Sequence, residues 1–298
     1  TYTAPHSPHV DQHPEEYVRY YQEHCTFSDV PQDPRSPWSI QMPHDIAYSL
    51  TFANKDREYL TLRDLLSGYY AAVQAVDDNV GRIVKKLEEK GILDNTLLVF
   101  TADNGFSCGQ HGIWGKGNGT FPLNLYDTAV KVPLLISWPG RIPMGRVSGR
   151  MCSQYDFMPT LLDLLDIPAQ LPDSLPGRSF QSALLHPDCE EEDGAVVVFD
   201  EYGPNRMIRT REWKLVHRYP YGPDELYHLS ADPGEEHNLI DREECQEIRA
   251  QLLDQLIRWF DRYVDPRMDA AKEGVTGYGQ LRRCGYYSEG RPVYYPLD

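Results

Sequence analysis

The chain has 298 residues, which is enough for one large domain or two smaller ones. Hydrophobic residues make up 41% of it and aromatic residues 11%, a composition typical of folded globular proteins and not of disordered ones. The formal net charge of −16 has the wrong sign for a surface that neutralises a phosphate backbone, which excludes nucleic acid as a partner.

The first 50 residues are rich in Pro and His and lack periodicity, so we predict a long loop after the end of a strand at Thr1–Thr3. A domain does not normally begin inside a strand, and this start indicates a truncated chain. No apolar run approaches the roughly 20 residues that a membrane span needs. The six cysteines include no Cys-x-x-Cys pair, which excludes a zinc knuckle or a thioredoxin-like motif.

The middle of the chain has the pattern of an α/β layer. Apolar residues recur at spacings of three and four over 59–90, which predicts one long amphipathic helix ending at Gly91. Short apolar runs at 97–100 and 132–138 have the length of strands buried on both faces, and a helical stretch follows at 158–165. We therefore predict a mostly parallel sheet sandwiched by helices and incomplete at its N-terminus.

The pattern changes to short strands after residue 185. These strands are predicted at 195–202, 207–210, 213–217 and 225–229, and their tight turns predict an antiparallel sheet. Apolar residues of helical period over 248–260 predict a helix that covers one face of this sheet. The expected organisation is an α/β catalytic portion at 1–185, a small α+β domain at 186–264 and an extended tail at 265–298.

Polar residues lie directly after the strand predicted at 97–100, at the end of the strand where open α/β sheets place their ligands. Asp103 offers carboxylate oxygens and Asn104 an amide oxygen, the hard donors that Ca²⁺ or Mg²⁺ prefers, and Gly105 permits a sharp turn. The alternative is an ordinary turn, because Asp-Asn-Gly is a common turn sequence.

A glycine-spaced loop, Gly109–Gly117, can bring His111 and Lys116 back beside this strand end. A metal ion, a Lys and a His would then bind a tetrahedral oxyanion and supply the local positive pocket that the negative chain requires. The alternatives are a solvated surface charge for Lys116 and a loop residue with one backbone partner for His111.

At this point the motifs resemble the sulfatase family of the alkaline phosphatase superfamily. The resemblance covers Tyr69–Gly140, with its TADNG, GQHGIWGKGN and VKVPLLISWPG segments, and extends over most of the chain. It includes APHSPH at the start and the pattern from Arg209 to Leu239.

The resemblance implies that Asp103 and Asn104 are ligands of one divalent cation, usually Ca²⁺. It implies that Lys116 contacts the sulfate and the leaving-group oxygen, and that His6 faces the sulfate and protonates the departing alcohol. His9 is the rival of His6, and His111 matches a family position near the pocket.

The family attacks sulfur with a formylglycine made from Cys or Ser in a C/S-x-P-x-R motif. No Cys of the chain is followed by x-Pro-x-Arg. Residues Ser174–Arg178 fit the Ser form, but they follow the metal loop, and we interpret them as a coincidental match. With the family's early pair of Asp ligands also absent, cation binding by this chain alone is expected to be weak.

The leading hypothesis is therefore sulfate-ester hydrolysis, with a formylglycine that is absent from this chain. Phosphate- or phosphonate-ester hydrolysis is the enzymatic alternative, because both groups are tetrahedral and both respond to a metal clamp. An inactive fragment or pseudoenzyme is the non-enzymatic alternative.

The expected ligand is a sulfated small molecule or a sulfated sugar. Its contacts would include His217, Arg218, Arg282 and Arg283, unless these residues are solvated or packed inside. The resemblance favours a soluble, extracytoplasmic protein, and the substrate and the oligomeric state are open.

Overall fold

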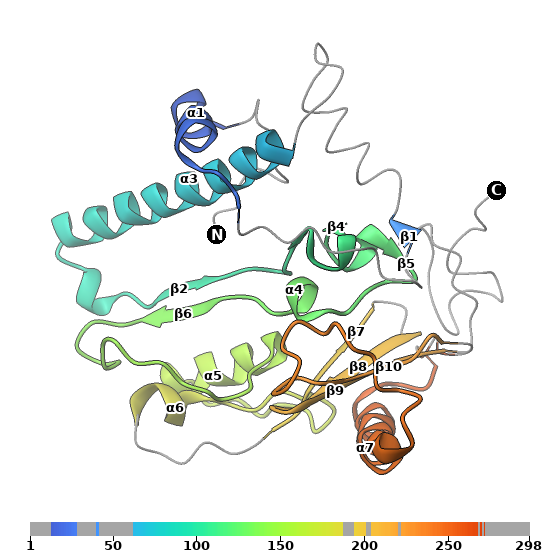
Figure 1. Ribbon diagram of the computed structural model, residues 1–298. Helices are drawn as coiled ribbons and strands as arrows, with labels where there is room; N and C mark the ends of the chain where they lie inside the picture. Colours follow the sequence, from blue (N-terminus) through green and yellow to red (C-terminus); the bar gives the residue numbers. More distant parts are fainter. Residues whose placement is uncertain are drawn as a thin grey trace. The chain divides into compact units, whose positions relative to one another are not determined.

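The computed structural model (Figure 1) describes residues 13–28, 40–41, 62–186, 194–200, 204–219, 222–267, 269 and 271. The chain divides into two compact units, Thr1–Gly140 and Arg141–Asp298. The boundary that we predicted at residue 185 lies inside the second unit, and the three-part organisation stays a prediction. None of the helices in the described part of the chain combines the length and apolar character that a membrane crossing requires.

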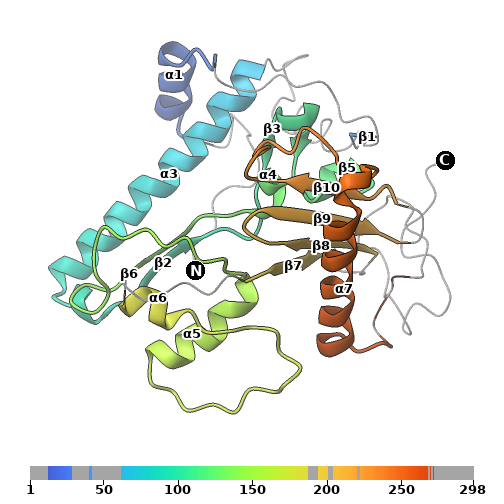
Figure 2. The same ribbon diagram turned by 60° about the horizontal axis from the view of Figure 1, so that its bottom comes forward.

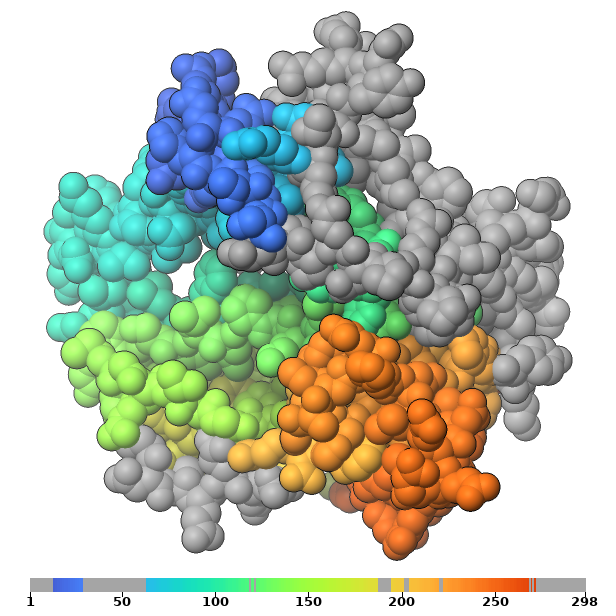
Figure 3. Space-filling view, in the orientation of Figure 1, coloured from blue at the N-terminus to red at the C-terminus, as the bar shows by residue number. Residues whose placement is uncertain are grey.

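The long helix predicted in the first unit is confirmed as α3, Leu62–Glu89. A second helix, α1 (Glu15–His24), packs against its first turns (Figures 1 and 3). The Arg63 guanidinium donates to the carbonyl oxygens of Gln22 at 2.9 Å and Cys25 at 2.8 Å, at the C-terminal end of α1.

Our prediction of a long loop over the first 50 residues is therefore wrong for α1. Two acidic residues, Glu15 and Glu16, lie in the first turn of this helix, where their negative charges interact favourably with the positive end of the helix dipole. Helices this short depend on tertiary packing, and the partner of α1 lies about 40 residues further along the chain. A local window therefore contains no signal for it.

The two apolar runs form β2 (Leu98–Thr101) and β6 (Leu134–Ser137), which pair antiparallel, with Leu98 opposite Ser137. This corrects our expectation that they belong to a parallel sheet. The segment between them contains only short strands, 3-10 turns and a helix of four residues, so no crossover helix carries the chain back to the starting edge.

The two strands are also more exposed than predicted. Phe100 is 41% exposed and Leu135 is 60% exposed, so these strands are not buried on both faces in this structure. An apolar run records the capacity of a strand to be buried, and only its neighbours decide whether it is.

Short elements shape the region of the predicted site, and all of them except β1 follow β2 in the chain. They comprise two two-stranded antiparallel sheets, in which β1 pairs with β5 and β3 with β4, and one short helix. Their bounds are β1 Ile40–Gln41, β3 Ser107–Cys108, β4 Trp114–Gly115, β5 Thr120–Phe121 and α4 Asp127–Val130.

The second unit contains the predicted antiparallel sheet, with strand order β10-β9-β8-β7. Two helices, α5 and α6, precede the sheet, and α7 follows it. The bounds are α5 Phe157–Leu164, α6 Gln181–Leu185, β7 Val196–Phe199, β8 Asn205–Arg209, β9 Trp213–Arg218, β10 Glu225–His228 and α7 Gln246–Tyr263.

Helix α7 covers one face of this sheet, as its periodicity predicts (Figure 2). Its buried residues Leu252, Leu256 and Phe260 are spaced by one helical turn. They join one core with alternate residues of the strands, including Val197, Ile208, Leu215 and Leu226. Burial of about ten apolar side chains at roughly 1.5–3 kcal/mol each is the main force that holds helix to sheet.

The β9–β10 pair also buries charged side chains. Lys214 Nζ donates to Glu235 Oε1 at 2.5 Å, and their side chains are 0% and 2% exposed. Arg218 pairs with Glu225 at 2.6 Å, and the Tyr227 hydroxyl also donates to Glu225 at 2.6 Å. Because a buried charge without its partner is very costly, the Lys214–Glu235 pair specifies the position of the 232–236 turn on the sheet.

We expect the Glu235→Gln substitution to lower the free energy of unfolding by roughly 3 kcal/mol, because it removes a negative charge that contacts the buried Lys214 ammonium. Glu236→Gln is the matched control, since Glu236 is exposed and its loss of charge should change stability by less than about 0.5 kcal/mol. Urea denaturation of both variants measures the difference. Equal stability of the two variants would contradict a structural role for the ion pair.

Candidate functional site

The Asp103-Asn104-Gly105 turn follows directly on β2. Asp103 is exposed, and its Oδ1 accepts a hydrogen bond from the backbone N–H of Asn104 at 2.9 Å. The Asn104 side chain donates from Nδ2 to the Gly105 carbonyl at 2.9 Å, and its Oδ1 accepts from Lys116. The turn thus carries one carboxylate and one amide oxygen, both hard donors.

Gly105 is required by a close approach of backbone. Its N–H donates to the Ala129 carbonyl at 2.9 Å, and a Cβ on residue 105 would lie 2.1 Å from the carbonyl oxygen of Thr128. No side chain fits in this space. The turn at the end of β2 is therefore seated directly against α4.

The β3–β4 pair brings Lys116 back to this turn, as the glycine spacing predicts. Ser107 pairs with Gly115 and Cys108 with Trp114, and the Gly109 N–H donates to the Ile113 carbonyl at 2.9 Å. Lys116, next in the chain, donates from Nζ to Asn104 Oδ1 at 3.3 Å. The Lys116 ammonium consequently lies beside the turn that carries the two oxygen ligands proposed for a cation.

His111 lies at the tip of the same hairpin, in the left-handed region with a φ of 55°. Gly109 and Gly112 also have positive φ, of 111° and 64°, so the loop bends tightly around the histidine. The His111 ring stacks on the Tyr126 ring, with 3.6 Å between centroids and 7° between planes. Its part in the site stays a prediction, as do those of His6 and His9, which lie outside the described residues.

A divalent cation fits this site in chemistry but not in number of ligands. Asp103 and Asn104 supply oxygens of the right kind, yet Ca²⁺ takes six to eight of them. Within the described ranges, no group of three or more His, Cys, Asp or Glu side chains is placed to hold a metal ion. Water molecules or further residues would complete the coordination.

The Ser174–Arg178 match has a structural explanation of its own. The Arg178 N–H donates to Asp156 Oδ1 at 2.8 Å, and a Cβ on Gly177 would lie 2.0 Å from the Tyr155 carbonyl oxygen. Asp156 is buried, and it also accepts the Ser153 N–H at 2.8 Å. The Pro-Gly-Arg part of the match therefore docks a loop onto the start of α5.

Two of the possible sugar contacts lie on β9. Arg218 is 2% exposed and paired with Glu225, so it serves internal packing and does not face a ligand. His217 is half-buried, and its Nδ1 lies 2.8 Å from Asp224 Oδ2. Burial raises the pKa of Asp224, but the hydrogen bonds from His217 and the Arg218 N–H outweigh it and leave this pKa below its usual value. Arg282 and Arg283 lie outside the described residues.

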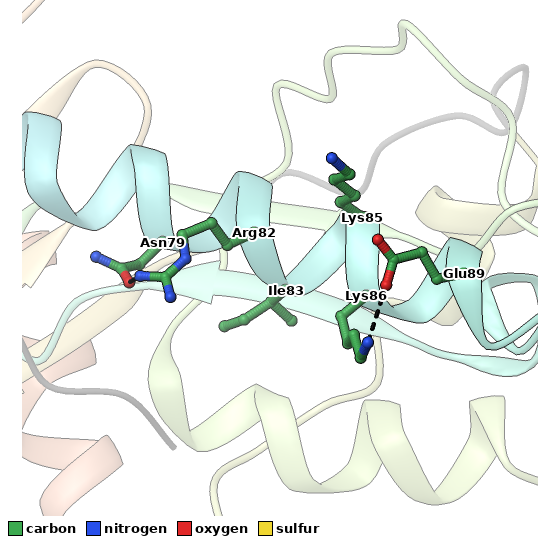
Figure 4. Close-up of a pocket in the computed structure, with 6 residues that line it drawn as sticks. All are labelled: Asn79, Arg82, Ile83, Lys85, Lys86 and Glu89. Atoms are coloured by element: carbon green, nitrogen blue, oxygen red, sulfur yellow. Dashed lines mark hydrogen bonds and ion pairs between the residues drawn. The ribbon is translucent and has the colours of Figure 1, made fainter.

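A surface groove of about 580 Å³ lies on the C-terminal half of α3, lined by Asn79, Arg82, Ile83, Lys85, Lys86 and Glu89 (Figure 4). Arg82 donates to Asn79 at 3.0 Å, and Lys86 donates to Glu89 at 2.9 Å. Two of its three cations are thus engaged within the helix. None of the predicted site residues lines this groove, and we interpret it as a solvated helix face.

The sequence did not indicate the residues of the 124–128 stretch that pack against the site. Asn124 contacts the Lys116 loop, Tyr126 contacts His111, and Thr128 lies against Gly105. Each contact joins separate elements of the chain, and no spacing or residue class in the Leu-Asn-Leu-Tyr stretch indicates it.

Comparison with known families decides the relationship of the chain. It matches the family described as Sulfatase over residues 1–167, which is more than half of its length. The chain belongs to the sulfatase family. It also matches the family described as N-sulphoglucosamine sulphohydrolase, C-terminal, over residues 109–261. This second match contains the whole antiparallel sheet and most of α7.

Among curated relatives of this sulfatase-family chain is an N-acetylglucosamine-6-O-sulfatase from Bacteroides thetaiotaomicron. It is 31% identical over 266 residues, which cover 83% of the chain and 46% of the relative. An arylsulfatase from Clostridium perfringens is 28% identical, over 96% of the chain and 56% of the relative. The chain thus spans about half the length of the curated relatives that it matches.

Solved structures of similar fold include two that are more than 25% identical to the chain in sequence. One is a protein bound to its substrate D-glucosamine-2-N,6-O-disulfate, with a TM-score of 0.58 and 29% identity over 68% of the chain and 41% of that protein. Another is a phosphonate monoester hydrolase of Agrobacterium radiobacter, with a TM-score of 0.59 and 27% identity over 68% of the chain and 42% of that enzyme.

We expect Gly105→Ala to destabilise the first unit by at least about 2 kcal/mol, because the new methyl group meets the Thr128 carbonyl. Gly81→Ala in α3 is the matched control. It has open space around it, and it should stabilise the helix by about 0.5–1 kcal/mol. Thermal unfolding of both proteins tests the close approach, which would be refuted by an unchanged melting temperature for Gly105→Ala.

Burial raises the pKa of the Cys108 thiol, on β3, to about 12. At pH 8 its thiolate fraction should then be on the order of 10⁻⁴, and only the thiolate reacts with iodoacetamide. We expect alkylation of Cys108 to be negligible in the folded protein and rapid after unfolding in urea, as followed by peptide mass spectrometry. Rapid alkylation of the folded protein would mean that the β3–β4 pair opens readily.

Proposed function

We propose that this chain is part of a hydrolase of sulfate esters, with Asp103 and Asn104 as ligands of a divalent cation and Lys116 as a contact to the sulfate. The observation that carries the proposal is the approach of Lys116 Nζ to Asn104 Oδ1, 3.3 Å, beside the Asp103 carboxylate. In a chain of net charge −16, this is where positive charge would gather to receive an anion.

Each group has a task in this proposal. The Lys116 ammonium donates hydrogen bonds to a sulfate oxygen and to the oxygen of the leaving alcohol, on which negative charge develops. Asp103 and Asn104 hold Ca²⁺, or Mg²⁺ in its place, which when bound polarises the sulfate. His6 acts as the acid that protonates the departing alcohol, and His111 lies at the edge of the pocket.

The nucleophile of the proposed reaction is a formylglycine, which the chain does not supply, since none of its cysteines begins a C-x-P-x-R motif. We expect no turnover by the chain alone. The alternative hypothesis, an inactive fragment or pseudoenzyme, also predicts no turnover. It differs from the proposed function because it predicts no cation site.

The substrate class in this proposal is a sulfated sugar. It is supported by the similarity to an N-acetylglucosamine-6-O-sulfatase and to a protein solved with a disulfated glucosamine. An extracytoplasmic location accompanies it as part of the proposal. Hydrolysis of phosphonate esters is the second candidate, supported by the similarity to the phosphonate monoester hydrolase of Agrobacterium radiobacter.

We expect calorimetry to detect Ca²⁺ binding with a dissociation constant on the order of 10⁻³ M, since two ligands are fewer than an efficient site provides. Asp103→Asn should abolish this binding, because it removes the only carboxylate of the proposed half-site. Asp94→Asn, which removes the same charge from an exposed turn, should bind Ca²⁺ as the unmodified chain does.

The same samples are then titrated with phenyl sulfate and with the phosphonate monoester phenyl methylphosphonate in the presence of Ca²⁺. Preference for the sulfate supports the sulfatase, whereas preference for the phosphonate supports the second candidate. If Asp103→Asn and the unmodified chain bind Ca²⁺ equally, the turn holds no cation. Hydrolysis of phenyl sulfate by the chain would overturn the assignment of an external nucleophile.

A further inference from the structure

One buried segment of the first unit, residues 124–129, contacts all three parts of the candidate site. Asn124 contacts the backbone of the Lys116 loop, Tyr126 contacts His111, and Ala129 accepts the N–H of Gly105. We propose that Asn124 and Tyr126 are positioning residues, which set the places of the Lys116 ammonium and the His111 ring. This inference rests on the proposed function, and it assigns neither residue a contact with substrate.

Asn124 is fully buried and holds the loop through its side-chain amide. Its Nδ2 donates to the carbonyl oxygens of Lys116 at 3.2 Å and Gly117 at 3.3 Å, and to Thr120 Oγ1 at 3.0 Å. Its backbone N–H donates to the Gly117 carbonyl at 3.0 Å. Asn124 therefore binds the loop directly after the end of β4, through the carbonyl oxygens of Lys116 and Gly117 and not through the Lys116 ammonium.

The chemistry of these contacts explains why an amide stands at this position. All the acceptors around Nδ2 are oxygens, so a carboxylate of the same shape would meet them with oxygen against oxygen. Asn124 Oδ1 has no hydrogen-bond partner among the described residues, although it is buried. A buried acceptor without a partner is unfavourable, and the donor side of the amide must compensate for it.

Tyr126 is 3% exposed, and it presents its ring flat against that of His111. The positive φ of His111 is a strained backbone conformation, which persists only where the surrounding structure holds it. The stacked rings, 3.6 Å apart, are such a determinant, because a rotation of the imidazole about its Cβ–Cγ bond breaks the stack unless it reaches about 180°. Tyr126 thus sets the plane of the His111 ring.

The end of the segment joins this support to the proposed cation ligands. Ala129 accepts the Gly105 N–H, and Thr128 Oγ1 lies 2.8 Å from the buried Ser107 hydroxyl. A displacement of residues 124–129 would consequently move Lys116 relative to Asn104, even if the β3–β4 pairing is kept.

The first test measures the placement of Lys116 by its rate of acetylation in the folded protein, followed by mass spectrometry of its peptide. We expect Asn124→Asp and Asn124→Ser to acetylate Lys116 several-fold faster than the unmodified chain, because the ammonium is no longer held at Asn104. Lys131, exposed at the C-terminal end of α4, is the internal control, and Asn95→Asp is the matched variant in an exposed turn. The two substitutions at residue 124 are independent, so one of them suffices if the other does not fold.

The proposal is overturned if Lys116 acetylation is unchanged in a folded Asn124 variant, or if Lys116 and Lys131 accelerate equally, which indicates general loosening. The rate is measured without cation or substrate. Faster Lys116 acetylation in the Asn124 variants, together with no Ca²⁺ binding by the unmodified chain, would therefore sustain the positioning role and refute the proposed function. An unchanged acetylation rate, together with Ca²⁺ binding that depends on Asp103, would refute the positioning role and sustain the proposed function.

The second test follows the ring proton of His111 by nuclear magnetic resonance. A proton stacked over an aromatic ring is displaced upfield, so we expect this displacement in the unmodified chain and in Tyr126→Phe, which keeps the ring. Tyr126→Leu keeps the apolar volume but not the ring, and it should abolish the displacement. An undisplaced proton in the unmodified chain, or a displaced one in Tyr126→Leu, would exclude the stacked arrangement.

Discussion

The candidate site depends on a close approach between two stretches of backbone. The Gly105 N–H meets the Ala129 carbonyl, and the Thr128 carbonyl oxygen occupies the place of a side chain at residue 105. This approach fixes the turn after β2 against the segment that also supports the Lys116 loop. Because the contact is made by main-chain atoms, its tolerance is set by sterics and not by the rotamer of any side chain.

The two units achieve stability by different means. The second unit has a continuous apolar core between α7 and one face of its sheet, with one buried ion pair between β9 and β10 and another between β9 and the 232–236 turn. In the first unit several apolar side chains of α3 and of the β2–β6 pair are exposed, Val73 at 51% and Leu135 at 60% among them. The order of the site therefore comes chiefly from hydrogen bonds and close packing around α4.

Local periodicity predicted the elements that are long or regularly patterned. The helices α3 and α7 and the strands β7 to β10 lie where their apolar spacing placed them, because one face of each must be buried. The same reasoning missed α1, whose stability comes from contacts with α3, and it assigned the wrong direction to the β2–β6 pairing. Strand direction depends on the path of the connecting chain, which apolar spacing does not record.

The sequence by itself showed the family, through the resemblance of its motifs. It also indicated the turn Asp103-Asn104-Gly105 and the return of Lys116 to it, because these depend on local residue chemistry and glycine spacing. Only the tertiary structure decided what holds these residues in place. It identified Asn124 beneath the Lys116 loop, Tyr126 against His111 and the Thr128 carbonyl against Gly105. Such contacts join separate stretches of the chain, and their partners become known only when the backbone has folded.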